Sequence, residues 1–176
     1  MKLPVRREQP PAVVVEAARL PRGEKVLAHA QDRAGSTDRW LLGTRNALVL
    51  VVPGEEPVRL PWETVQAAEW DSEESTLSVR EVGEYGRPRS SYAFSFDNPA
   101  RLLQLVRERV TASVVVQRGY QVVGRKGFTV IGRRAPEGRG PITWMHEYDA
   151  GVDPADPAVA AAAEAALERA RADVGE

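Results

Sequence analysis

Residues 90–110 read SSYAFSFDNPARLLQLVRERV, and within this stretch the spacing of apolar side chains changes from that of a strand to that of a helix. Aromatic side chains first alternate with small or polar ones, as is typical of a half-buried strand, at Tyr92, Phe94 and Phe96. Asn98 is then a suitable N-cap, and Pro99 suits a first helical turn. Apolar side chains follow at helical spacing, at Leu102, Leu103, Val106 and Val110. The stretch therefore predicts a strand and then a helix from Pro99 to about Val110.

The chain before this helix shows the same alternation in short segments that are separated by turn residues. We expect about seven strands, at residues 25–31, 39–44, 47–52, 57–62, 65–70, 76–82 and 90–96. The tight turn at Arg45-Asn46 makes the second and third of these a hairpin. Residues 1–22 hold four prolines among charged residues, so we expect an irregular N-terminal arm in which Val13–Val15 could add an edge strand.

The chain after the helix returns to strands and ends in a second helix. Strands are expected at residues 114–123, 128–133 and 142–148, with glycine-containing turns between them. Asp156 is a suitable N-cap for the terminal helix, whose apolar side is mostly alanine and so buries little area. We expect residues 113–176 to form a β-β-β-α extension packed on the preceding domain, either lengthening its sheet or forming a small module of its own.

Three short motifs in the first part resemble those of bacterial pleckstrin-homology-like (PH-like) domain proteins of actinobacterial type. They are LPRGEKVL at residues 20–27, WLLGTRN at residues 40–46, and LPWETV at residues 60–65 leading to Ala68-Glu69-Trp70. The resemblance implies an α+β fold in which residues 23–112 form a PH-like β-barrel or roll of about seven strands, capped by the helix. It also implies a role as an interaction or assembly module. PH domains bind inositol phosphates through basic residues of the first hairpin loop. Here that loop, residues 32–38, offers only Arg33, with Arg39 just past it, beside two aspartates, so we do not expect phosphoinositide binding.

Composition excludes several kinds of site. The 176 residues carry a formal net charge of −1, and 43% are hydrophobic. The chain has no cysteine, which excludes disulfides, thiolate zinc sites and iron–sulfur clusters and fits a cytoplasmic protein. We expect no signal peptide, because the apolar run near the N-terminus, Ala12–Val15, is too short and is followed by Glu16. We expect a soluble chain, because the longest β-like apolar run, Ala47–Val52, is far too short to cross a bilayer. Only three basic residues are lysines, which is typical of a GC-rich bacterial genome.

No catalytic set can be assembled from the sequence. The two histidines, His29 and His146, have no further metal-ligand residues at fixed spacing, and we interpret both as packing residues. The paired carboxylates at residues 55–56 and 73–74 lie in expected turns, where water would solvate them. The nucleophile motif Gly-x-Ser-x-Gly does not occur. We therefore expect no enzyme activity, no cofactor and no metal.

Charge is unevenly distributed along the chain. Residues 55–84 hold nine acids against two arginines, a net charge of −7, whereas residues 118–139 carry a net charge of +5. The basic residues of the second segment form a candidate binding cluster: Arg118, Arg125, Lys126, Arg133, Arg134 and Arg139. The segment could bind nucleic acid or anionic lipid, it could complement the acidic half within the chain or between subunits, or it could be a solvated surface. We favour a non-enzymatic module that binds another protein or itself, with nucleic-acid or anionic-surface binding as the alternative.

Overall fold

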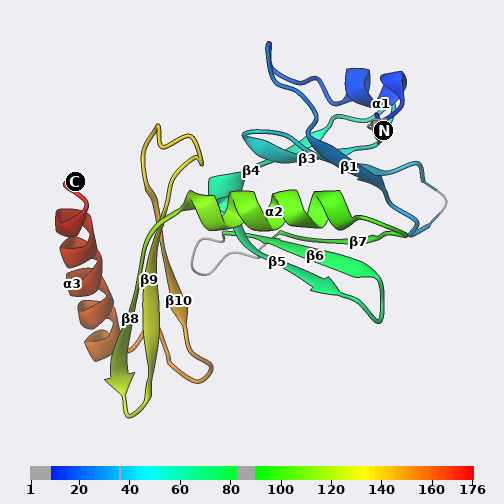
Figure 1. The fold of residues 1–176 in the computed structure, drawn as a ribbon. Coiled ribbons are helices and arrows are strands. Elements are labelled where there is room, and N and C mark those ends of the chain that lie inside the picture. The colour runs from blue at the N-terminus through cyan, green and yellow to red at the C-terminus, as the bar shows by residue number, and fades with distance from the viewer. Residues whose placement is uncertain (1–8, 36, 83–89) are drawn as a thin grey trace, which may run out of the picture. The chain divides into compact units, whose positions relative to one another are not determined.

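The computed structural model describes residues 9–35, 37–82 and 90–176, and it is an α+β protein. The chain divides into two compact units, residues 1–110 and 111–176, and each is described by itself. The described residues form ten strands in three antiparallel sheets, three α-helices and one short 3-10 helix (Figure 1). None of the helices is long and apolar enough to span a membrane in the part of the chain that is described.

The first unit contains seven strands in two sheets. Strands β1 (Ala28–Gln31), β2 (Trp40–Gly43), β3 (Ala47–Val51) and β4 (Val58–Pro61) form one sheet in that order. Strands β5 (Val65–Asp71), β6 (Thr76–Glu81) and β7 (Ser91–Ser95) form the other. The predicted barrel or roll is not closed into a barrel: among the described strands β4 and β5 belong to separate sheets, and a 3-10 helix at Trp62–Thr64 lies between them in the chain. Beyond the end of β1, Arg33 N donates to Ser95 O at 2.8 Å, which joins the chain to β7.

The predicted helix is confirmed as α2 (Ala100–Ser113), and its stripe packs against one core that both sheets share. The alternation in β7 is also confirmed, since Phe94 is fully buried. Gly43 in β2 lets the helix approach closely, because a Cβ atom there would lie 2.6 Å from Leu105 Cδ2. The largest side chains of this core are Leu41, Leu48, Leu60, Trp62, Leu77, Phe94, Phe96 and Leu102.

The prediction for the N-terminal arm was wrong over residues 12–17, which form helix α1 (Ala12–Ala17) and not an irregular segment or an edge strand. The carbonyl of Pro11 accepts hydrogen bonds from the amides of Val14 and Val15 at 3.0 and 3.2 Å and so starts the helix. Val14 is fully buried against β2 and β3 in a second apolar cluster. This tertiary burial outweighs the strand preference of three consecutive valines. Residues 1–8 of the expected arm lie outside the described residues.

The second unit has the predicted order of three strands and a helix. Strands β8 (Val114–Val123), β9 (Lys126–Arg133) and β10 (Thr143–Tyr148) form an antiparallel sheet with β9 in the centre, and α3 (Pro157–Asp173) lies along it (Figure 1). Asp156 caps α3 as predicted, accepting from the amides of Ala158 and Val159 at 2.8 and 3.3 Å. The alanine side of α3 packs on Phe128 and Val130 through Ala163, Ala166 and Ala170.

Candidate binding groove

Glu24, the glutamate of the first sequence motif, stabilises the first sheet through hydrogen bonds and an ion pair. Its side chain is only 4% exposed and accepts from the hydroxyl of Thr44, from the amide of Asn46 at 3.3 Å, and from Arg59 Nη2 at 2.8 and 3.0 Å. Burial opposes ionisation of Glu24, but hydrogen bonds and charge from Arg59, with the hydroxyl of Thr44, outweigh it and lower its pKa. Glu24 therefore ties the turn between β2 and β3 to β4.

The tryptophan of the third motif, Trp62, fixes the same turn from the core side. It is fully buried, and its Nε1 donates to the carbonyl of Thr44 at 3.2 Å. Its backbone amide donates to the carbonyl of Asn46 at 3.3 Å. The motif residues Glu24 and Trp62 thus have structural roles and are not available to a ligand.

The arginines of the first hairpin loop are both paired with carboxylates. Arg39 forms an ion pair with the buried carboxylate of Asp32 at 3.3 Å, and Arg33 forms one with Asp97. Asp32 Oδ1 also accepts from the amides of Ala34 and Ser95 at 3.0 and 2.8 Å. A phosphate group at this loop would have to compete with both carboxylates for the arginines.

The six residues of the predicted basic cluster do not form one surface. Arg125 and Lys126 lie at the turn between β8 and β9, whereas Arg133 and Arg134 lie at the opposite end of β9. Because β9 has eight residues, the two ends are separated by about 25 Å. Arg139 follows β9 in the connection to β10 and is exposed.

Four of these six residues make contacts inside the second unit. Arg118 pairs with Asp173 at 3.1 Å, and Lys126 Nζ donates to the carbonyl of Ala150 at 2.8 Å. Arg134 lies 4.0 Å from a carboxylate oxygen of Glu176. Arg133 is only 5% exposed and donates to the hydroxyl of Ser113 at 2.8 Å; burial lowers its pKa, and the nearby Glu147 opposes that shift. Only Arg125 and Arg139 have no such contact with the residues that the structure describes.

Both histidines contact aromatic side chains. The ring of His146 lies 5.8 Å from that of Phe128, and its Nε2 is 3.1 Å from the carbonyl of Ala163 in α3. The ring of His29 lies 6.0 Å from that of Trp40. Over residues 9–35, 37–82 and 90–176, no group of three or more histidine, aspartate or glutamate side chains could hold a metal ion.

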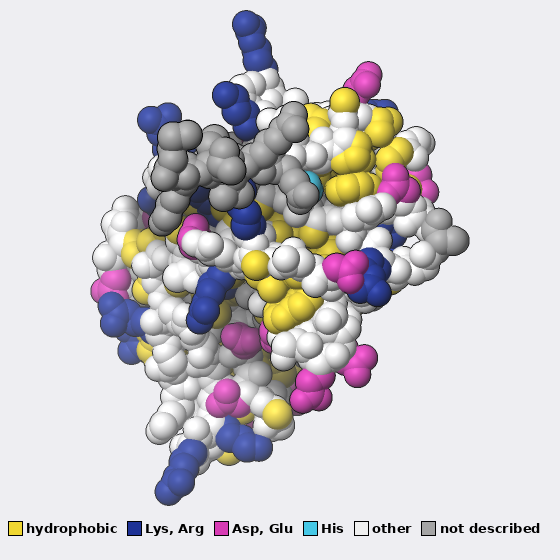
Figure 2. Space-filling model, turned by 45° about the vertical axis from the view of Figure 1, so that its right-hand side comes forward, with side chains coloured by type: hydrophobic (Ala, Val, Ile, Leu, Met, Phe, Trp, Pro, Cys, Tyr) yellow, Lys and Arg dark blue, Asp and Glu magenta, His cyan; other side chains and the backbone are white. Residues whose placement is uncertain are grey.

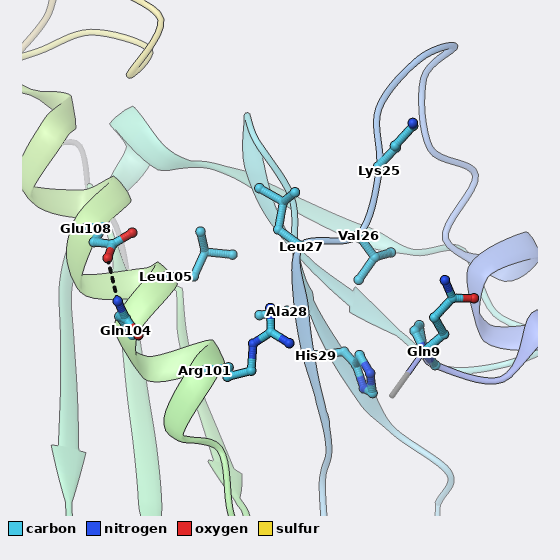
Figure 3. Close-up of a pocket in the computed structure, with 11 residues that line it drawn as sticks. Gln9, Lys25, Val26, Leu27, Ala28, His29, Arg101, Gln104, Leu105 and Glu108 are labelled. Atoms are coloured by element: carbon cyan, nitrogen blue, oxygen red, sulfur yellow. Dashed lines mark hydrogen bonds between the residues drawn. The ribbon is translucent and has the colours of Figure 1, made fainter. Parts of the chain in front are cut away.

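A groove of about 460 Å³ lies where β1 faces α2, and the sequence did not predict it. Figure 3 shows Arg101, Gln104, Leu105 and Glu108 along one wall, which is α2. Residues 25–29, at and just before β1, cross the middle, and Gln9 and Pro10 complete the lining. β1 is the edge of its sheet and pairs with β2 alone among the described strands, so the groove runs beside a sheet edge.

The groove combines apolar side chains with cations that make no polar contact with described residues. Leu27 is 42% exposed and faces Leu105 of α2 across the groove (Figure 3). Lys25 and Arg101 are exposed and make no hydrogen bond or ion pair with any residue that the structure describes. Glu108 accepts from Gln104 Nε2 at 2.9 Å and is the one carboxylate among the described residues that line the groove. Figure 2 shows exposed hydrophobic side chains on the face that it presents, with both basic and acidic side chains around them.

No model of a known protein family matches the chain, and no curated protein matches it either. The identification of the groove therefore rests on its geometry. One signal in the sequence could have pointed to it: Arg101, Gln104, Leu105 and Glu108 recur at the spacing of a single helix face beside the buried stripe. The strand at residues 25–31 was predicted, but its position opposite that helix face could not be read from the sequence.

Proposed function

We propose that this chain is a non-enzymatic, cytoplasmic interaction module that binds an extended segment of another protein in the groove between β1 and α2. The observation that carries the proposal is the exposed Leu27 at a sheet edge opposite a helix wall. Edge strands accept an additional strand from a partner, and neighbouring pockets select its alternate side chains. A volume of about 460 Å³ lies in the range of ligand pockets, about 300–1,000 Å³.

The PH-like assignment belongs to the same proposal. It is supported by seven strands in two sheets that share one core with the helix that follows them. PH-like folds host many unrelated functions, so the assignment favours an interaction role only in general terms. The groove supplies the specific hypothesis, because it offers a sheet edge, an apolar contact and a helix wall in one place.

The proposal is tested by selecting phage-displayed random linear peptides on the full chain and measuring the affinity of the selected peptides for two variants. Leu27→Ser removes the exposed apolar side chain of the groove. Val58→Ser is the matched control, because Val58 is 37% exposed and lies in β4, the opposite edge strand of the same sheet. We expect peptides that bind Val58→Ser as tightly as the unmodified chain and bind Leu27→Ser at least tenfold more weakly. Peptides that bind both variants equally, or no enriched peptide at all, would contradict the proposal.

A further inference from the structure

We infer that the groove between β1 and α2 selects an acidic segment, in which an aspartate or glutamate stands two residues from an apolar residue. The inference rests on the proposed function and names the chemistry of its ligand. It starts from the order of side chains along α2, where Arg101, Leu105 and Glu108 follow one another on the groove wall (Figure 3).

The cations of the groove favour an anionic ligand. Five other arginines of the first unit already form ion pairs with carboxylates: Arg19, Arg33, Arg39, Arg59 and Arg80. Arg101 and Lys25 have no such partner among the described residues, and both side chains are exposed at the groove. Arg101 extends from α2 toward Ala28, whereas Lys25 lies farther from the helix (Figure 3). A carboxylate beside Arg101 would gain a charge-assisted hydrogen bond that no described residue of the chain provides.

The spacing of the helix wall matches that of an extended peptide. Arg101 and Leu105 are four residues apart on α2, which corresponds to about 6 Å along the helix axis. In an extended strand, side chains two residues apart point the same way and are separated by about 6.6 Å. A peptide lying along α2 can therefore place a carboxylate at Arg101 and, two residues away, a leucine or valine against the exposed Leu27, beside Leu105, which is 8% exposed.

Glu108 limits the acidic character of the ligand at the other end of the wall. It lies about 10 Å from Arg101 along the helix, which corresponds to about three residues of extended chain. Its carboxylate would repel an acidic residue at that place. We therefore expect a neutral or basic residue there, so the ligand has a directional charge pattern and is not uniformly acidic.

Fluorescence polarisation with three synthetic peptides tests the inference on the full chain. The probe is a fluorescein-labelled octapeptide, Gly-Ser-Asp-Ser-Leu-Ser-Ser-Gly. The controls carry lysine in place of aspartate, or place aspartate directly beside leucine. We expect the probe to bind at least tenfold more tightly than the lysine peptide and measurably more tightly than the shifted peptide. Equal affinities for the probe and the lysine peptide would overturn the inference.

Charge-reversal variants test whether the preference for the acidic peptide depends on Arg101. Arg101→Glu is expected to weaken binding of the probe at least tenfold and to make the lysine peptide the tighter ligand. Arg107→Glu is the matched control, because Arg107 is exposed on α2 but does not line the groove, and it should change the affinity less than twofold. Equal losses in the two variants would show attraction to the helix as a whole and overturn the inference.

Two further outcomes separate the inference from the proposed function. If selected peptides depend on Leu27 but are neutral, the proposed function stands and the preference for acidic segments is wrong. Vesicles containing phosphatidylglycerol provide the other comparison. If they bind the chain in an Arg101-dependent manner while none of the peptides does, the groove recognises an anionic lipid headgroup and the inference is overturned.

Discussion

Replacing Glu24 with glutamine should destabilise the first unit, because Glu24 is the buried carboxylate that joins β4 to the turn between β2 and β3. Glutamine has nearly the same shape and can still accept from Thr44 and Asn46 through its oxygen. The interaction that is lost is the ion pair with Arg59, whose Nη2 lies 2.8 and 3.0 Å from the two carboxylate oxygens. Hydrogen bonds to charged groups contribute about 1.5–3 kcal/mol. Because the Arg59 side chain is 34% exposed and water can partly solvate it again, we expect a loss of about 2 kcal/mol.

The effect should depend on pH in a defined direction. The pKa of Glu24 is lowered in the folded chain, so its carboxylate stabilises the fold above the ordinary pKa of 4.5. That contribution is lost as the pH falls through the lower pKa of the folded state. The difference in unfolding free energy between the unmodified chain and Glu24→Gln should therefore be full at pH 7 and shrink progressively below about pH 4.5.

Urea unfolding followed by tryptophan fluorescence measures this difference. A Trp144→Phe background removes the tryptophan of the second unit, so the remaining three tryptophans report on the first. Glu69→Gln is the matched control, because Glu69 pairs with Arg80 at 2.7 Å but both side chains are about half exposed or more. Exposed pairs contribute at most about 1 kcal/mol. Equal unfolding midpoints for Glu24→Gln and Glu69→Gln, or a difference that stays constant down to pH 3, would refute the reasoning.

Two further substitutions test the structure, one in each unit. Gly127→Ala should destabilise the second unit by at least about 3 kcal/mol, because its Cβ would lie 1.7 Å from the backbone oxygen of Tyr120. Gly119→Ala in the same sheet, whose nearest atom lies 4.0 Å away, should cost no more than about 1 kcal/mol, and comparable melting temperatures for the two variants would contradict the geometry. Trp62→Phe should cost about 1–3 kcal/mol in urea unfolding, because it leaves the carbonyl of Thr44 without its indole donor; an unchanged midpoint would show that this bond contributes nothing.

The secondary structure could be predicted largely from the period of apolar residues. The change at residues 90–110 gave the order of β7 and α2, because burial of one face imposes a period of two on a strand and 3.6 on a helix. The same reasoning failed for Val13–Val15, since three adjacent valines carry no period and only tertiary contact decides their conformation. That the two sheets of the first unit stay separate and do not close into a barrel also could not be predicted, because closure depends on pairing between strand edges.

The candidate site could be predicted less well from the sequence than the fold. Segregated charge in the sequence pointed to residues 118–139, yet a charge count does not show that Arg118 meets Asp173 or that Arg133 is buried. The groove was not predicted, because its residues are not close together in the sequence. Arg101 and Lys25 are far apart in the sequence, and only the folding of α2 beside the edge of β1 brings them to one surface. A site made of dispersed residues leaves no local motif.

In the first unit, the polar residues that hold the fold together differ from those that are exposed to a ligand. Glu24 and Trp62 satisfy their polar atoms within the fold, so a ligand could use them only by breaking bonds that hold the sheet together. Arg101 and Lys25 contribute no described bond to the fold, and exposed substitutions of this kind change stability by about 0.5 kcal/mol or less. Stability and binding are therefore expected to depend on separate residues. A loss of binding in Arg101→Glu without a shift in its urea midpoint would assign that loss to the groove and not to unfolding.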